Sequence, residues 1–174
     1  ENVLRVYPTH TRALMVSAKA QAQRGKMADA EKLLATVIAN EPGNLDARFM
    51  VAMTNAAQGR TDVAVSQIES GRKLQPDDTR WSLALAALHS RRGEKVLARK
   101  TLEEAMAKSG EKPELLEKLA TLQIELKDGT GALQTFENLL KKNATSFEYR
   151  LGRAGAQALA GDRQGALKLY ADCL

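Results

Sequence analysis

Residues 27–49, MADAEKLLATVIANEPGNLDARF, decide the fold because the same arrangement returns at a fixed interval along the chain. Apolar residues at helical spacing predict an amphipathic helix in the first part of this stretch. The Pro-Gly-Asn turn at 42–44 ends that helix, since proline cannot continue it, and asparagine is suited to capping the next one. Residues 61–81, TDVAVSQIESGRKLQPDDTRW, begin 34 residues later and carry a similar pattern. The sequence therefore predicts a repeated helix–turn–helix unit.

Three sets of equivalent positions, each spaced by 34 residues, carry one kind of side chain throughout the chain. The first two sets are alanine and the third is large and apolar: Ala18, Ala52, Ala86, Ala120 and Ala154; Ala30, Ala64, Ala98, Ala132 and Ala166; and Leu34, Ile68, Leu102, Phe136 and Tyr170. Alanine allows two helices to cross closely, and the large residues would fill the space between helix pairs. One pair could not bury its own apolar surface, so we expect the pairs to stack into a solenoid.

Glycine and proline recur at the same interval, in the turn between the two helices and at the end of the second helix. These residues are Gly25, Gly59, Gly93 and Gly161, and Pro8, Pro42 and Pro76. Glycine suits a tight turn after a helix, whereas proline cannot continue a helix. Lys127 stands at the glycine position of the fourth unit and Gly129 and Gly131 follow it, which predicts a displaced turn there. Gly110 stands where proline is expected, and Pro113 then begins the next helix.

These positions resemble the tetratricopeptide repeat (TPR), a helix–turn–helix unit of 34 residues. The match consists of the small residue in the middle of the first helix, the turn glycine, the alanine and the large apolar residue of the second helix, and the closing proline. The resemblance covers essentially the whole chain. It implies an all-α fold, an α-α superhelix (TPR solenoid) of about five helix–turn–helix repeats.

The expected repeats, after the end of a preceding second helix at 1–10, are 11–44, 45–78, 79–112, 113–146 and a truncated fifth at 147–174. We expect a single continuous solenoid and interpret the chain as a piece of a longer array. The array is divergent and of bacterial type, because the family's usual aromatic residues are replaced in the first helix. One of these rows is polar instead and is expected at the helix interface: Gln21, Asn55, His89, Gln123 and Gln157.

Composition and motifs favour a binding module over an enzyme. Hydrophobic residues make up 44% and charged residues 27% of the chain, as in ordinary globular proteins. No apolar run reaches the roughly 20 residues that cross a bilayer. Neither of the two histidines, His10 and His89, has cysteine or carboxylate companions at metal-ligand spacing, and the single Cys173 excludes an intrachain disulfide. No nucleotide-binding or hydrolase motif is present, so we predict no catalytic, cofactor-binding or metal-binding residues.

The TPR resemblance implies that the first helices line a concave surface that binds another protein or a peptide. Carrying the family's groove positions over gives an apolar floor with basic residues around it: Arg12, Met15, Lys19, Phe49, Met53, Arg80 and Leu83. Methionine suits an adaptable peptide-binding surface. The alternative is that Met15, Phe49 and Leu83 simply pack between adjacent first helices. The basic and asparagine clamp with which some TPR proteins grip a chaperone's terminal carboxylate is matched only at Arg80.

The formal net charge is +5, and much of the basic excess lies in one part of the third repeat. The members of this predicted basic patch are Arg91, Arg92, Lys95, Arg99 and Lys100. Such a patch can attract an anionic partner, although nearby glutamates make a solvated helix face the alternative. Nucleic acid is not expected as a partner, because the groove positions do not form a base-reading series from one repeat to the next.

We therefore predict a non-enzymatic scaffold that binds a protein or peptide on its concave face. The resemblance to divergent bacterial arrays suggests a part of a larger bacterial protein of envelope assembly, such as exopolysaccharide export or secretion, in the periplasm or envelope rather than the cytoplasm. Two alternatives stay open. The chain could be the regulatory or substrate-docking arm of a larger enzyme, or an oligomerisation module that self-associates through open repeat ends.

Overall fold

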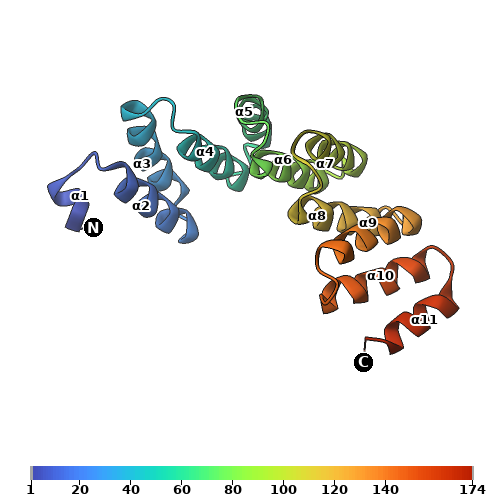
Figure 1. Ribbon diagram of the computed structural model, residues 1–174. Helices are drawn as coiled ribbons and strands as arrows, with labels where there is room; N and C mark the ends of the chain where they lie inside the picture. The colour runs from blue at the N-terminus through green and yellow to red at the C-terminus, as the bar shows by residue number, and fades with distance from the viewer. Residues whose placement is uncertain (1, 174) are drawn as a thin grey trace. The chain divides into compact units, whose positions relative to one another are not determined.

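The computed structural model describes residues 2–173 as eleven α-helices joined by short turns, with no strand in that range (Figure 1). The helices are α1 (Asn2–Val6), α2 (Thr11–Gln23), α3 (Met27–Asn40), α4 (Leu45–Ala57), α5 (Thr61–Leu74), α6 (Thr79–Arg91), α7 (Lys95–Ser109), α8 (Pro113–Glu125), α9 (Gly129–Lys142), α10 (Phe147–Leu159) and α11 (Arg163–Ala171). This confirms the all-α fold class expected from the repeat. Glu1 and Leu174, which bound the predicted segments 1–10 and 147–174, lie outside the described residues.

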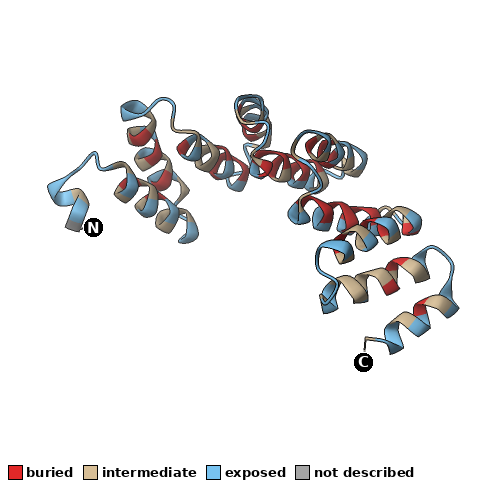
Figure 2. Ribbon diagram, viewed as in Figure 1, coloured by how far each residue is buried: buried red, intermediate tan, exposed pale blue. Residues whose placement is uncertain are grey.

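The described helices form consecutive pairs. The first helices α2, α4, α6, α8 and α10 each span 13 residues and begin at 34-residue intervals. Each packs against the second helix that follows it, and α3 also packs on α4, as α7 does on α8 and α9 on α10. Buried residues follow the sides of the helices that face these neighbours (Figure 2).

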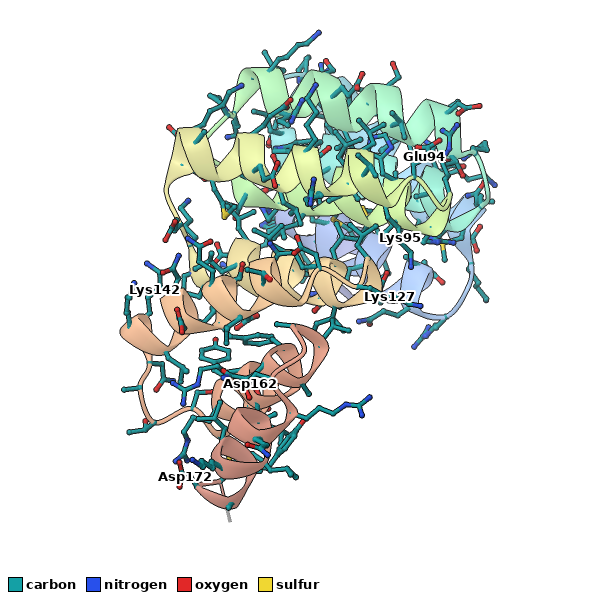
Figure 3. The ribbon with its side chains drawn as sticks, turned by 90° about the vertical axis from the view of Figure 1, so that its right-hand side faces the viewer. Glu94, Lys95, Lys127, Lys142, Asp162 and Asp172 are labelled. Carbon is teal, nitrogen blue, oxygen red and sulfur yellow. The ribbon has the colours of Figure 1, made fainter. Side chains whose placement is uncertain are left out.

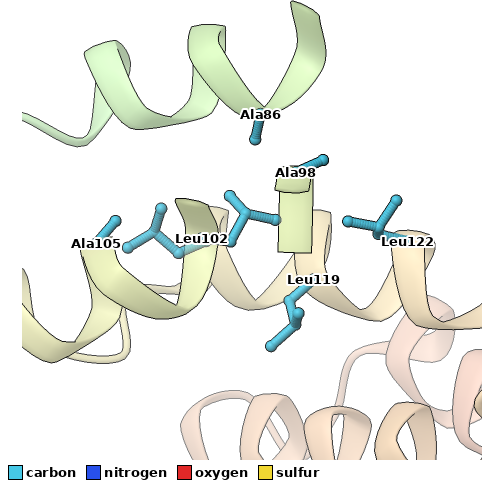
Figure 4. Packing of buried hydrophobic residues seen from close by; sticks show 7 residues of the cluster. Ala86, Ala98, Leu102, Ala105, Leu119 and Leu122 are labelled. Atoms are coloured by element: carbon cyan, nitrogen blue, oxygen red, sulfur yellow. The ribbon is translucent and has the colours of Figure 1, made fainter. Parts of the chain in front are cut away.

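The chain divides into two compact units, an N-terminal unit (Glu1–Gln75) and a C-terminal unit (Pro76–Leu174). The core cluster of the N-terminal unit contains Leu14, Ala18, Ala30, Leu34, Val37 and Ala47. The C-terminal unit has a corresponding cluster drawn from α6, α7 and α8, with Ala86, Ala98, Leu102, Ala105, Leu115, Leu119 and Leu122 (Figure 4). We describe the two units separately. That they form a single continuous solenoid stays a prediction.

The two alanine rows are buried in every repeat. All ten alanines are at most 5% exposed, which allows the paired helices to approach closely. The large apolar row is less uniform, because Leu34, Ile68 and Leu102 are fully buried, whereas Phe136 is half-buried and Tyr170 is 37% exposed. In the described residues no further helix follows α11 to cover Tyr170. The expectation that this row fills the space between pairs therefore holds for three of its five members.

The turn between the two helices of a repeat has one backbone geometry in all five repeats, so the displaced turn expected at Lys127 is wrong. Lys127 has a φ of 60°, in the left-handed region that the turn glycines of the other repeats also adopt. Its amide donates to the Ile124 carbonyl at 3.0 Å, and the Asp128 amide donates to the Gln123 carbonyl at 2.8 Å. Equivalent bonds close the other four turns. These bonds satisfy carbonyls at the helix end, which offsets the cost of a lysine in this conformation.

Gly129 and Gly131 have packing roles instead of a turn role. A Cβ at Gly129 would lie 2.3 Å from the Ala160 amide nitrogen, so this glycine permits the start of α9 to pass close to the end of α10. A Cβ at Gly131 would lie 2.5 Å from an oxygen of Asp128, the residue that caps α9 by accepting from the Gly131 amide at 2.9 Å. Both glycines were misread from the sequence because these close neighbours come from the folded chain.

Side chains cap most of the first helices. Asn44 accepts from the Ala47 amide at 2.9 Å, and Asp78 accepts from the Arg80 amide at 3.1 Å, as the sequence predicted for both residues. His10, one of the two histidines, accepts from an amide of α2 in the same way. Pro113 begins α8, where its missing amide hydrogen leaves no bond unmade.

The polar row of the first helices lies at the interface within each repeat, as expected. Asn55, His89 and Gln123 are buried. The Asn55 side-chain amide donates to the Gln67 side chain at 2.8 Å, which links α4 to α5. The Thr135 hydroxyl donates to the Gln123 side-chain oxygen at 2.8 Å, which links α8 to α9. His89 lies 2.7 Å from a carboxylate of the following turn. Buried polar side chains therefore find partners across the helix pair.

Candidate protein-binding grooves

An apolar groove lies between the first helices α2 and α4 of the N-terminal unit, with a volume of about 320 Å³. We call it the α2–α4 groove. Its lining residues are Lys19, Ala22 and Gln23 of α2, Met27 of α3, and Phe49, Met50, Met53, Thr54 and Ala57 of α4. Three methionines and one phenylalanine form most of its large side chains, and Lys19 is the one charged lining residue.

Helical spacing explains how the sequence builds this groove. Phe49 and Met53 are four residues apart on α4, and Lys19 and Gln23 are four apart on α2, so each pair lies on one face of its helix. Alanine at position 22 supplies little side-chain volume, which leaves the space between the helices open. Met53 is 39% exposed and Lys19 is exposed, so the groove is accessible from solvent.

A second groove lies between the first helices α6 and α8 of the C-terminal unit, with a volume of about 220 Å³. We call it the α6–α8 groove. Its lining residues are Leu83, Ala86, Ala87, Ser90 and Arg91 of α6, Ala98 and Leu102 of α7, and Lys118, Thr121, Leu122 and Glu125 of α8. Its floor therefore belongs to the core cluster of this unit, and its charged side chains come from both first helices.

The two grooves use equivalent positions of the repeat. Seven lining positions correspond, two repeats apart: Lys19 and Ala87, Ala22 and Ser90, Gln23 and Arg91, Met50 and Lys118, Met53 and Thr121, Thr54 and Leu122, and Ala57 and Glu125. The repeat thus forms the same kind of groove in each unit with different side chains. The α2–α4 groove is apolar and nearly uncharged, whereas the α6–α8 groove carries three charged residues.

The structure brings together three of the predicted groove residues, Lys19, Phe49 and Met53, in the α2–α4 groove. Leu83 lines the α6–α8 groove but is also partly buried against the core cluster of its unit. Met15 is partly buried against the core of the N-terminal unit and is not among the lining residues. These two packing contacts correspond to the alternative interpretation considered for Met15 and Leu83.

The two predicted arginines lie outside the linings of both grooves. Arg12 is exposed on the first turn of α2. Arg80 is exposed at the start of α6, where its guanidinium pairs with the Asp78 carboxylate at 2.7 Å. This hydrogen bond with Arg80 is the main reason that the pKa of Asp78 is lowered from its usual value.

Sequence reasoning did not assign Met27 and Lys118 to a groove. Met27 begins a second helix, and the family's groove positions are on first helices, so the carry-over could not include it. Lys118 could have been found, because it stands two repeats after Met50 at a position that faces the next first helix.

Ion pairs engage three of the five members of the predicted basic patch. The pairs are Arg92 with Glu94 at 3.0 Å, Lys95 with Glu125 at 3.1 Å, and Arg99 with Glu103 and with Asp128, each at 3.5 Å. Figure 3 labels Glu94 and Lys95, which are neighbours at the start of α7. Acidic partners from the same and the next repeat thus offset part of the positive field, and a role of the patch in binding stays a prediction.

Within residues 2–173, no three side chains of histidine, cysteine, aspartate or glutamate are grouped so that they could hold a metal ion. No helix in the same range is long and apolar enough to span a membrane.

Paired helices of constant length and spacing define a protein of the helical-repeat class. Two family models described as tetratricopeptide repeat match residues 22–88 and 117–173. The chain belongs to the tetratricopeptide repeat family. This family fold supports a scaffold for protein–protein interaction, and TPR proteins are generally non-catalytic. A search of curated protein sequences finds no significant match.

Solved TPR structures share the fold. A tetratricopeptide repeat protein from Parabacteroides merdae is similar with a TM-score of 0.77 and 20% identity, over 94% of this chain and 65% of its own. A MamA protein is similar with a TM-score of 0.74 and 17% identity, over 94% and 90% of the two chains. The protein TTC0263 from Thermus thermophilus is similar with a TM-score of 0.71 and 21% identity, over 91% and 87%. At these identities the likeness is one of fold.

Proposed function

We propose that this protein is a non-enzymatic scaffold that binds a partner protein or peptide along its first helices, with the α2–α4 groove as the contact in the N-terminal unit. One observation carries the proposal: Lys19, Phe49 and Met53, chosen as groove positions by family resemblance, line a single apolar groove between adjacent first helices. Non-enzymatic action fits a TPR chain in which neither sequence nor geometry provides a set of catalytic side chains.

The chemistry of the groove suits an apolar side chain of a partner. Its volume of about 320 Å³ lies at the small end of the range for ligand pockets, which favours an inserted side chain over a large cofactor. Methionine side chains can adapt to differently shaped apolar groups, and an apolar helix or strand docks through such contacts. Lys19, at the edge of the groove, can donate hydrogen bonds to a backbone carbonyl or a carboxylate of the partner.

Met53→Glu tests this proposal directly. The substitution places a charge at a half-exposed groove position on a helix that tolerates glutamate, so the fold should persist while an apolar partner is excluded. Wild-type and variant proteins are immobilised, exposed to an extract of the source cells, and the retained proteins are quantified by mass spectrometry. We expect specific partners of the wild type to be lost from Met53→Glu, with an unchanged helical circular dichroism spectrum.

Val63→Glu is the matched control, because Val63 is an exposed apolar residue of the same unit that lies on the second helix α5, outside the groove. This control should retain the wild-type partners. Retention of the same partners by Met53→Glu would overturn the assignment of the groove.

A place in bacterial envelope assembly stays a prediction from the sequence, as do a docking-arm role and self-association through repeat ends. Fractionation of source cells tests the first, and light scattering over a range of concentrations tests the last. A mass that rises with concentration would support self-association.

A further inference from the structure

Two basic side chains line the α6–α8 groove from opposite helices. Arg91 belongs to the last turn of α6 and Lys118 to the middle of α8, and both are exposed. The one acidic lining residue is Glu125, whose carboxylate is paired with Lys95 at 3.1 Å. Because Lys95 already offsets the charge of Glu125, the lining leaves an excess of positive charge from Arg91 and Lys118.

The floor of this groove is apolar and shallow. Leu102 and Leu122 are buried members of the core cluster, and Leu83 packs against the same cluster. The groove volume of about 220 Å³ is below the roughly 300–1,000 Å³ of typical small-molecule pockets. It therefore fits one inserted aliphatic side chain of a larger partner better than it fits a metabolite.

The equivalent positions of the α2–α4 groove carry no such charge. Arg91 corresponds to Gln23 and Lys118 corresponds to Met50. The repeat geometry is the same, so the two grooves should prefer different partner surfaces. The difference lies in charge and not in the backbone.

We infer that the α6–α8 groove binds an acidic segment of a partner protein, with an aliphatic side chain on the floor and flanking carboxylates on Arg91 and Lys118; this inference rests on the proposed scaffold function. A guanidinium can bind a carboxylate through two parallel hydrogen bonds, and an ammonium attracts one as a point charge. Charge complementarity of this kind speeds association and excludes basic segments.

Single-stranded RNA is the other polyanion to consider, and the lining disfavours it. Proteins that bind single strands combine a basic groove with aromatic side chains on which bases stack. The lining of the α6–α8 groove contains no aromatic residue. An acidic peptide needs no stacking surface, and its aliphatic side chain uses the apolar floor.

Fluorescence anisotropy with the full chain tests the inference. The probe is a fluorescein-labelled synthetic peptide in which leucines are separated by pairs of glutamates, and its counterpart has lysine at every glutamate position. We expect the acidic peptide to bind, with an affinity that falls as salt is raised, and the basic peptide not to bind. Labelled polyuridine is measured alongside.

The double variant Arg91→Glu/Lys118→Glu reverses both charges at exposed positions and should weaken the acidic peptide by about tenfold or more. Lys141→Glu/Lys142→Glu is the matched control, since it changes net charge equally on exposed residues outside the groove. Figure 3 places Lys142 at the opposite end of α9 from Lys127. Ala87→Glu, at an exposed lining position, adds a repelling charge to a helix without removing any contact of the core.

Equal binding of the acidic peptide by the groove variant and its control would overturn the inference, because the attraction would then be general. No binding of the acidic peptide, or tighter binding of polyuridine that the groove variant abolishes, would also overturn it. Met53→Glu separates this result from the proposed function. If that variant loses its cellular partners while the acidic peptide ignores Arg91 and Lys118, the scaffold function stands and this inference fails.

Discussion

Lys127 occupies the left-handed turn that glycine occupies in the other four repeats, with a φ of 60°. A side chain in this conformation costs about 1–2 kcal/mol, because its Cβ crowds the backbone. The two turn hydrogen bonds of the fourth repeat keep the same geometry in spite of that cost. The position therefore depends on how the backbone must turn, and glycine is the residue that meets this need most cheaply.

Lys127→Gly should raise the free energy of unfolding by about 0.5–1 kcal/mol, since relief of the left-handed strain exceeds the added flexibility of the unfolded chain. Chemical denaturation measures it. Gly59→Ala, at a turn glycine with a φ of 78°, should lower stability by a similar amount.

Gly43→Ala is the control for these turn variants, because its φ is not in the left-handed region and an added Cβ would meet no atom within 4 Å. It should leave stability unchanged or slightly higher. A loss of stability in Lys127→Gly would contradict the strain argument.

At the scale of the helices, buried polar pairs join the two members of a repeat. Thr135 of α9 donates to Gln123 of α8 at 2.8 Å, and both residues are buried. Thr135→Val keeps the shape of the side chain but leaves the Gln123 oxygen without this donor, so we expect a loss of about 1–3 kcal/mol in the free energy of unfolding.

Gln123→Leu/Thr135→Val removes both polar partners and should recover part of that loss, as measured in a double-mutant cycle by chemical denaturation. Additive losses from the two substitutions would show that the hydrogen bond does not couple α8 to α9.

A second link joins α10 to α8, where the Tyr149 hydroxyl donates to the Glu117 carboxylate. This hydrogen bond is the main cause that raises the pKa of Tyr149 to about 12, from a usual value of 10. Because the folded value is the higher one, the link contributes its full stability below about pH 10 and loses it as the pH rises toward 12.

Glu117→Gln should move the pKa of Tyr149 back toward its usual value, because the amide that replaces the carboxylate carries no charge. Ultraviolet absorbance of the phenolate measures this titration, and Tyr149→Phe identifies the signal by removing it. A titration that Glu117→Gln leaves unchanged would contradict the assigned link.

At the scale of the whole molecule, stability should be local, since each helix pair of a repeat protein is stabilised mainly by its neighbours. Leu34 is fully buried in the N-terminal unit, and Leu139 is fully buried in the C-terminal unit. Truncation of either to alanine should cost about 2–5 kcal/mol, because it removes apolar contacts and leaves a cavity.

Leu34→Ala should therefore accelerate amide hydrogen exchange mainly within residues 2–75, and Leu139→Ala mainly within residues 76–173. Mass spectrometry of peptide fragments measures both patterns, and each variant serves as the control for the other. Uniform acceleration along the chain in both variants would instead indicate one cooperative folding unit.

The sequence alone determined the class of fold and the helix pairs. Alanine, glycine and proline act on the backbone nearest to them, and a constant spacing along the chain therefore reports a constant local structure. The Ala18 and Ala30 rows predicted the close helix crossings, and Asn44 and Asp78 predicted the caps, because each of these effects is local. The family groove positions likewise predicted that Lys19, Phe49 and Met53 could act together.

Tertiary structure decided the features that depend on contacts between helices. Met15 and Leu83 pack against the cores of their units, and Lys95 finds Glu125 of the next repeat, which offsets part of the predicted basic patch. Lys127 keeps the turn geometry because two backbone hydrogen bonds hold it there. Spacing along the chain tells which face of a helix a side chain occupies, but packing of the helices decides which side chains meet across that face.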